Sequence, residues 1–267
     1  MEPTKNWTLG DSSLVPHRMG PRPVLEKALF PDNFNIRISY RTERDALIPL
    51  LPPGIEPAGD PIVHFAYRHS EKLDWVCSSE LNVIGMCVDA VYRGERDQEA
   101  GAYWPALWEN DPMAVILGRE LFGVPKLCAD VSNPIQGEHG CRALLSEAGR
   151  PLIEMRIRDL SPIEGEALAG VRGIAEKASV LGWKQFPTVN GRETELGYAT
   201  HLPGPIRIEQ AWIGSGDVRI FEPDPDVNMW NHSIIETLQA LPLSECLGAS
   251  LSRGSSEHQI GAARALR

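Results

Sequence analysis

The sequence lacks any long uninterrupted run of hydrophobic residues. No segment of the 267 residues approaches the roughly 18 apolar residues that a membrane-spanning helix needs. The first twenty residues also lack the basic start and the apolar central region of a signal peptide. We therefore expect a protein that has no membrane partner and is located in the cytoplasm.

Cysteine is scarce and irregularly spaced. The five cysteines form no C-x-x-C pair, and we interpret them as free thiols in a reducing compartment. Of the seven histidines only His64 and His69 lie close together, and a five-residue offset on a strand puts them on opposite faces. We therefore expect no metal site. The G-x-S-x-G and P-loop motifs are missing as well, which argues against common hydrolase and nucleotide-binding classes, and we expect no cofactor.

Positive charge is in deficit. The chain has 26 lysines and arginines against 36 aspartates and glutamates, which gives a net charge of −10. A nucleic-acid partner is not expected, because binding to phosphates needs a basic surface. An anionic small-molecule substrate would have to be attracted by positive charge gathered locally in a site.

What the sequence has is a two-residue alternation of apolar and polar residues, which predicts strands. The predicted strands cover residues 34–40, 61–69, 80–93, 208–213 and 218–221, with two more between 140 and 159. The GSGD sequence at 214–217 predicts a hairpin turn, and Ser233 with Glu236 fits a capping box before a short helix. Many strands and few helices favour a closed or sandwiched antiparallel β domain.

The two ends of the chain differ from its middle. Residues 1–29 mix proline, glycine and charge without a period, and we interpret them as an N-terminal arm that packs on the surface or on a partner subunit. Residues 252–267 are predicted to form a flexible tail. The length is compatible with one large domain, and we treat residues 1–267 as a single domain.

One lysine is a candidate for chemistry. Lys126 ends the run GRELFGVPK (118–126) and is surrounded in sequence by leucine, phenylalanine, valine and cysteine. Apolar surroundings favour the neutral amine, because desolvation penalises the ammonium form. The neutral amine is the nucleophile that forms a Schiff base with a carbonyl compound. The alternative is open, however, because the alternation over residues 126–131 by itself favours a lysine that faces water.

The run GRELFGVPK resembles the active-site signature of the acetoacetate decarboxylase family. In that family, the lysine of a GRE-x4-PK stretch forms the imine with the substrate. The resemblance extends in one order over roughly residues 30–250, through the segments 34–57, 61–65, 181–201 and 208–221.

The resemblance implies a fold and an activity. The fold is mainly β with a few short helices (α+β), built as a closed antiparallel β-barrel or cone with flanking strands. The activity is that of a Schiff-base lyase which decarboxylates a small β-keto acid such as acetoacetate. Family members are homo-oligomers, so a homo-oligomer is expected here.

The resemblance also implies roles for individual residues. Lys126 is the imine-forming residue, and Glu80 matches a functional glutamate that transfers protons or orients the substrate. Arg119 and Glu120 would pair with each other or with neighbouring strands and hold the turn of the lysine in place. Phe122 would support the substrate pocket.

This chain departs from the decarboxylase pattern at three positions. Leu127 stands where the decarboxylases carry a second lysine, Asn33 replaces a pocket arginine, and Ala66 replaces a pocket glutamate. Ala66 lies on the strand that contains His64, a further candidate pocket residue. Two alternatives therefore stay open: a Schiff-base aldolase-dehydratase or cyclase that acts on a larger oxo acid, and a non-catalytic β-barrel that binds an apolar ligand.

Overall fold

The computed structural model describes residues 26–76 and 78–267. Its strands are β1 (Ala28–Arg41), β2 (Ile55–Pro57), β3 (Ile62–Glu71), β4 (Glu80–Arg93), β5 (Gln98–Glu109), β6 (Lys126–Cys128), β7 (Asp130–Val131), β8 (Ile135–Gly137), β9 (Gly140–Glu147), β10 (Arg150–Pro162), β11 (Ser179–Pro187), β12 (Thr194–Pro203), β13 (Ile206–Ile220), β14 (Glu245–His258) and β15 (Arg264–Ala265). Its α-helices are α1 (Arg44–Leu47), α2 (Pro112–Phe122), α3 (Gly165–Ala175) and α4 (His232–Gln239), and two 3₁₀ turns cover Ile48–Leu50 and Ile260–Ala262.

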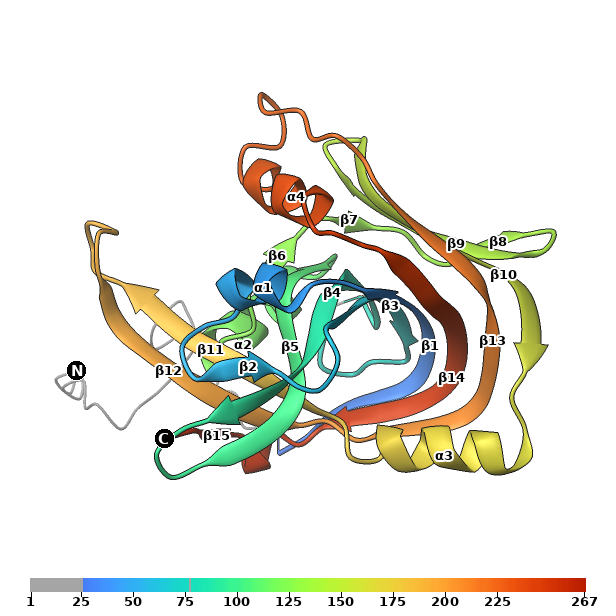
Figure 1. Cartoon of the computed structure of the whole chain (residues 1–267), viewed down its shortest axis with the longest axis horizontal. Coiled ribbons are helices and arrows are strands. Elements are labelled where there is room, and N and C mark those ends of the chain that lie inside the picture. Colours follow the sequence, from blue (N-terminus) through green and yellow to red (C-terminus); the bar gives the residue numbers. More distant parts are fainter. Residues whose placement is uncertain (1–25, 77) are drawn as a thin grey trace, which may run out of the picture.

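All the strands belong to one strongly curved sheet (Figure 1). Its main path runs β15-β12-β11-β5-β4-β3-β1-β14-β13-β10-β9-β7, with β2, β6 and β8 attached beside it. The sheet is mixed, because β5 pairs in parallel with both β6 and β11. In the described residues no pairing joins β7 to β15. The mainly β character is confirmed, whereas the sheet is mixed and not purely antiparallel, and its closure into a barrel is not found among the described residues.

The parallel pairing has a local cause. The chain leaves β5, passes through α2 and returns as β6 alongside β5. A helix between two neighbouring strands lets the second strand run in the same direction as the first. Lys126 is therefore the first residue of the second strand in a β-α-β unit.

The main core lies on one face of β1, β3, β4 and β5. Their buried residues alternate along each strand: Ile36 and Ile38 on β1, Val63, Phe65 and Tyr67 on β3, Ile84, Met86 and Val88 on β4, and Ala106 and Trp108 on β5. Because successive side chains on a strand point to opposite faces, the residues between them line the other face. That other face carries the polar residues Asn35, Arg68 and Glu109.

Several predictions about individual segments are corrected by the structure. Residues 214–217 form no turn but lie inside the continuous strand β13. Glycine is needed there because a Cβ at Gly214 would lie 2.3 Å from the carbonyl oxygen of Arg158 on β10. The helix predicted at Ser233 exists as α4, but its N-cap Asn231 makes no side-chain capping bond.

The C-terminal end of the chain differs from the prediction. Residues 252–267, predicted as a flexible tail, form the second half of β14, a 3₁₀ turn and β15. They are held by pairing of β14 with β1 and β13 and of β15 with β12. Of the predicted arm 1–29, residues 1–25 lie outside the described residues.

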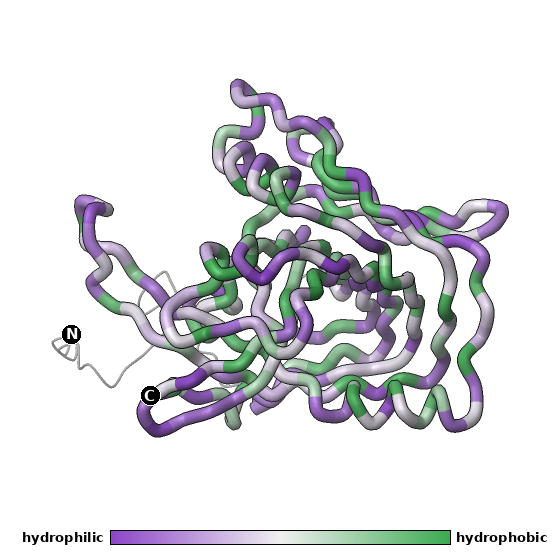
Figure 2. The backbone as a smooth tube through the Cα atoms, viewed as in Figure 1, coloured by the Kyte–Doolittle hydropathy of each residue, from purple (hydrophilic) through white to green (hydrophobic). Residues whose placement is uncertain are grey.

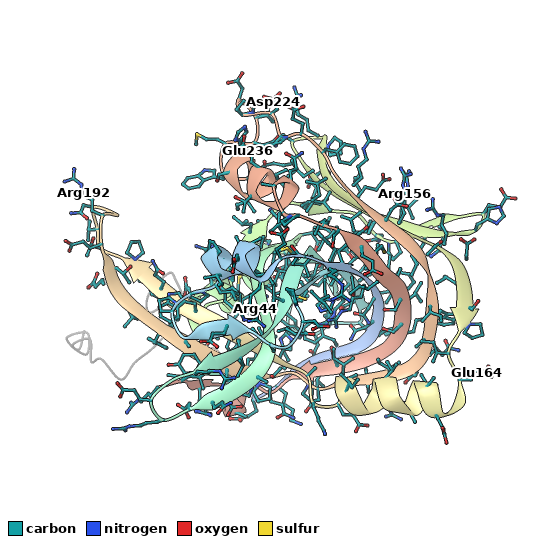
Figure 3. The ribbon with its side chains drawn as sticks, in the orientation of Figure 1. Arg44, Arg156, Glu164, Arg192, Asp224 and Glu236 are labelled. Carbon is teal, nitrogen blue, oxygen red and sulfur yellow. The ribbon has the colours of Figure 1, made fainter. Side chains whose placement is uncertain are left out.

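Polar side chains lie at two projecting edges of the molecule. The tip of the hairpin that joins β11 and β12 is hydrophilic (Figure 2), and the exposed side chains of Arg192 at this tip and Glu164 before α3 lie at the periphery of the molecule (Figure 3). No helix in the described part of the chain is long and apolar enough to cross a membrane.

Candidate functional site

Helix α2 and strand β6 set the position of Lys126. Asp111 caps the helix by accepting hydrogen bonds at Oδ1 from the backbone N–H groups of Met113 (2.8 Å) and Ala114 (3.1 Å). Gly123 ends the helix in the left-handed conformation, with φ of 67°. A Cβ at this residue would lie 2.2 Å from the backbone nitrogen of Lys184 on β11, so only glycine fits. The chain then turns sharply into β6.

The side chain of Lys126 is enclosed. Only 13% of it is exposed, and its Nζ lies 2.8 Å from Glu109 Oε1 and donates to the backbone oxygen of Ala114 at 3.2 Å. The lysine lies directly against Gly118 of α2, where an added Cβ would come within 2.3 Å of Lys126 Cε. The absence of a side chain at Gly118 therefore leaves the space that the lysine occupies.

Glu109, the last residue of β5, is the carboxylate that faces this amine. Its side chain is 4% exposed. Whereas Oε1 contacts Lys126, Oε2 is buried and has no hydrogen-bond partner among the described residues. A buried carboxylate oxygen without a partner is costly, and a catalytic role or a bound water or ion would account for it.

Two further basic side chains approach the same region. Arg68 on β3 places its guanidinium carbon 5.5 Å from the centre of the Phe30 ring, and the His258 ring packs on Phe30 at 4.9 Å. The pKa of His258 is lowered to about 3, chiefly by burial and then by the positive charges of Arg68 and Lys126. Burial also lowers the pKa of Arg68, which the negative charge of Glu109 opposes. The site thus combines one buried carboxylate with two cations and a neutral imidazole.

The lowered pKa of His258 predicts a loss of stability in acid. The folded protein holds this histidine neutral, whereas the unfolded chain protonates it below about pH 6.5. The free energy of unfolding should therefore fall as the pH drops from about 6.5 towards 3, by about 1–2 kcal/mol at pH 5 from this group. Urea unfolding at pH 7 and pH 5 should show a smaller fall for His258→Phe than for the unaltered protein.

The control for this measurement is His139→Phe, because the side chain of His139 is 75% exposed. It should leave the difference between pH 7 and pH 5 unchanged. An equal acid sensitivity in the unaltered protein and in His258→Phe would contradict the burial of a neutral His258.

The residues predicted next to Lys126 have different surroundings. Arg119 is exposed and donates from Nη1 to the backbone oxygen of Lys126 at 3.0 Å, which ties α2 to β6. Glu120 is partly buried and forms no ion pair among the described residues. Phe122 ends α2, and its backbone oxygen accepts a hydrogen bond from the hydroxyl of Thr200.

Glu80 is not brought to the amine. It is exposed at the start of β4, opposite Glu71 of β3. Its backbone nitrogen and oxygen both bond to the hydroxyl of Ser78. Among the described residues the carboxylate in contact with Lys126 is that of Glu109. The role suggested for Glu80 by the resemblance stays a prediction.

Asn33 and His64 belong to separate polar groups. Asn33 is buried, donates to Ser256 Oγ at 2.9 Å and accepts from Ser70 Oγ at 2.7 Å. His64 lies 2.8 Å from Ser39 Oγ and 3.2 Å from Asp89 Oδ2, and burial lowers its pKa. Neither side chain forms a hydrogen bond with Lys126 in the described structure.

Sequence reasoning missed Glu109, Arg68 and His258. Each one lies on a different strand from Lys126, and it is the pairing of the strands in the sheet that brings them together. A weak signal existed for Glu109, because it ends an apolar strand directly before the capped helix that carries the signature. In the described part of the chain no group of three or more histidine, cysteine or acidic residues could hold a metal ion.

Comparison with known proteins gives the family. The family model described as acetoacetate decarboxylase (ADC) matches residues 15–257. A relative named acetoacetate decarboxylase from Paraburkholderia phytofirmans is 32% identical over 102 residues, which cover 38% of this chain and 36% of that protein. The chain thus matches only about a third of the length of that relative.

Solved structures share the fold. An acetoacetate decarboxylase from Legionella pneumophila superposes with a TM-score of 0.72 at 19% identity, covering 93% of this chain and 92% of that one. The enduracididine biosynthesis enzyme MppR, complexed with the condensation product of pyruvate and imidazole 4-carboxaldehyde, gives a TM-score of 0.62 at 17% identity, covering 96% and 98%. The family model spans nearly the whole described chain, including the helix and strand that hold Lys126. The protein therefore belongs to the acetoacetate decarboxylase family.

Proposed function

We propose that the protein is a lyase in which Lys126 forms a Schiff base with a small oxo acid, and that its reaction is the decarboxylation of a β-keto acid. The observation that carries this proposal is the enclosed contact of Lys126 Nζ with Glu109 at 2.8 Å. The amine of a lysine that is held away from water is a protected nucleophile, and a carboxylate beside it can accept its proton. The family membership supports the same chemistry.

The reaction proceeds in four steps. The unprotonated nitrogen of Lys126 attacks the keto carbon of the substrate, and the keto oxygen leaves as water, which gives an iminium ion. The bond to the carboxylate then breaks, carbon dioxide departs, and its electron pair moves through the adjacent carbon towards the positive nitrogen. The resulting enamine takes up a proton on carbon, and water hydrolyses the imine to release the ketone and free Lys126.

Glu109 serves as the proton acceptor for the amine. The nitrogen of lysine attacks only after it has lost a proton, and Glu109 Oε1 is within hydrogen-bond distance. Its second oxygen has no partner among the described residues and is free to bond to a substrate hydroxyl or to water. Glu80 is the candidate that the resemblance suggested for this role, and comparison of the two glutamates decides between them.

A Schiff-base aldolase-dehydratase is the second candidate. The structure of MppR, which has the same fold, holds a condensation product of pyruvate and an aldehyde. This chain also has Leu127 directly after Lys126, together with Asn33 and Ala66, at three positions where the resemblance leads one to expect charged residues. A non-catalytic protein that binds an apolar ligand is less compatible with Glu109 and Arg68 in the site. A homo-oligomer and a cytoplasmic location stay predictions.

Assays of the two reactions test this proposal. Decarboxylation predicts release of carbon dioxide from acetoacetate by the unaltered protein, and a fall to the background rate in Lys126→Met. If carbon dioxide is not released but pyruvate and an aldehyde give a conjugated enone absorbance, the second candidate replaces the first. Retention of either activity by Lys126→Met would contradict the Schiff-base mechanism, and Lys184→Met, which alters a lysine on β11, is the control.

A further inference from the structure

Arg68 shares one face of the sheet with Glu109. Strand pairing puts Arg68 of β3 directly opposite Val83 of β4, and Val83 directly opposite Glu109 of β5. Residues that are directly opposite each other on neighbouring strands point to the same face. Two strand spacings separate the backbones of Arg68 and Glu109, which is about 10 Å. Arginine and glutamate are both long enough to reach into the space above Val83.

The guanidinium of Arg68 is held in position by its neighbours but pairs with no carboxylate of the described residues. Its Nε donates to Asn35 Oδ1 of β1 at 3.1 Å, and its plane lies over the Phe30 ring at 5.5 Å. Among the described residues no carboxylate lies within ion-pairing distance of it, and its two terminal nitrogens donate no hydrogen bond. Most other arginines on this sheet form an ion pair with a carboxylate. Arg142 on β9 and Arg156 on β10, for example, both pair with Glu154.

An arginine in this state is suited to bind a carboxylate. Its planar head offers two parallel N–H donors that match the two oxygens of a carboxylate. The orientation is already fixed by Asn35 and Phe30, so little conformational freedom is lost on binding. The net charge of −10 makes such a local cation necessary if an anionic ligand is to approach.

We propose that Arg68 binds the carboxylate of the oxo acid whose carbonyl group reacts with Lys126, and that it supplies the positive charge that is missing where Asn33 replaces a pocket arginine. This assignment rests on the proposed function. Asn33 itself is occupied by hydrogen bonds to Ser70 and Ser256 and carries no charge. Arg68 therefore makes the site specific for carbonyl compounds that carry a carboxylate.

The test compares pyruvate with its uncharged methyl ester. Each is trapped on the protein with borohydride over a range of concentrations, and intact mass gives the concentration for half-maximal labelling. Arg68→Met should raise this concentration for pyruvate by about 10- to 100-fold, as the loss of a charge-assisted bidentate contact predicts. Arg68→Met should change the half-maximal concentration for methyl pyruvate by no more than about twofold, because the ester has no carboxylate for Arg68 to bind.

The matched control is Arg253→Met. The guanidinium of Arg253 also lies over a phenylalanine ring, that of Phe34, at 5.6 Å, but it is exposed on β14. It should change neither value. If Arg68→Met does not fold, Arg68→Gln, which keeps a donor for Asn35, takes its place. Equal labelling by pyruvate in the Arg68 variant and the unaltered protein would overturn the assignment.

A second measurement separates this assignment from the proposed function. The binding of pyruvate without borohydride is followed as the increase in melting temperature of the unaltered protein, Arg68→Met and Lys126→Met. If no carbonyl compound labels Lys126 but pyruvate stabilises the unaltered protein and not Arg68→Met, the carboxylate site stands and the Schiff-base lyase does not. If labelling occurs and pyruvate stabilises Arg68→Met as well as it stabilises the unaltered protein, the lyase stands and the role of Arg68 is rejected.

Discussion

We expect Gly118→Ala to reduce borohydride labelling of Lys126 by at least about 100-fold. The new Cβ would lie 2.3 Å from Lys126 Cε and 2.9 Å from Nζ, so the lysine side chain has to move. The movement separates the amine from Glu109, and displacement of a reacting group by about 1 Å costs roughly a factor of 100 in rate. Alanine favours a helix more than glycine does, so α2 itself is not expected to unfold.

The matched control is Gly173→Ala in α3. Nothing lies within 4 Å of a Cβ built there, although Gly173 is also a glycine inside a helix. It should keep full labelling and gain about 0.5–1 kcal/mol in free energy of unfolding. Labelling of Gly118→Ala at the unaltered rate would show that the amine does not react from the position between α2 and β5.

The second large effect is expected for Glu109→Gln. Glutamine keeps the shape of the side chain but cannot accept the proton of the amine, so the turnover rate should fall by about 10²- to 10⁴-fold. The stability should fall as well, by about 1–3 kcal/mol, because Lys126 loses its buried charge partner. The rate is measured per folded molecule, with folding checked by circular dichroism.

Two variants accompany Glu109→Gln. Glu154→Gln alters another carboxylate that is 4% exposed and ion-paired, to Arg142 and Arg156, and it should lose stability without loss of turnover. Glu80→Gln tests the role in proton transfer that the resemblance suggested for Glu80. A greater loss of turnover in Glu80→Gln than in Glu109→Gln would return the role of the proton-transfer group to Glu80.

Much of the fold could be predicted from residue periodicity. The strand predicted at 80–93 coincides with β4, and the pair predicted between residues 140 and 159 corresponds to β9 and β10. Alternation identified these strands because one face of each packs on the core. The sequence pattern was misleading at residues 214–217. Glycines allow neighbouring strands to approach closely there, but glycine is also typical of turns.

The arrangement of the strands was harder to predict than the strands themselves. The parallel pairing of β5 with β11 joins segments that lie far apart in the sequence, and no local pattern indicates it. The pairing of β5 with β6 depends on how α2 folds back over the sheet. A closed antiparallel barrel was therefore expected, whereas the structure shows a mixed sheet whose closure is not found among the described residues.

The site shows the same division. Lys126 could be singled out because its local sequence resembles a family signature, but alternation over residues 126–131 favoured a lysine that faces water. The structure decides against this through Gly118 and Glu109, because a three-residue strand is covered by the helix that precedes it. Glu109 is brought to Lys126 by the parallel pairing of β5 with β6, and Arg68 is brought to the same face as Glu109 by the register of β3, β4 and β5.

The proposed chemistry depends on the reactivity of one enclosed amine, and peptide mapping after borohydride reduction tests it most directly. The protein is incubated with pyruvate or acetoacetate, reduced and digested, and every lysine-containing peptide is examined by mass spectrometry. We expect a reduced adduct on Lys126 and none on the exposed Lys72, whose Nζ lies 2.7 Å from Asp32 Oδ2. Absence of an adduct on Lys126 with both acids, or equal labelling of Lys72 and Lys126, would contradict the proposed chemistry.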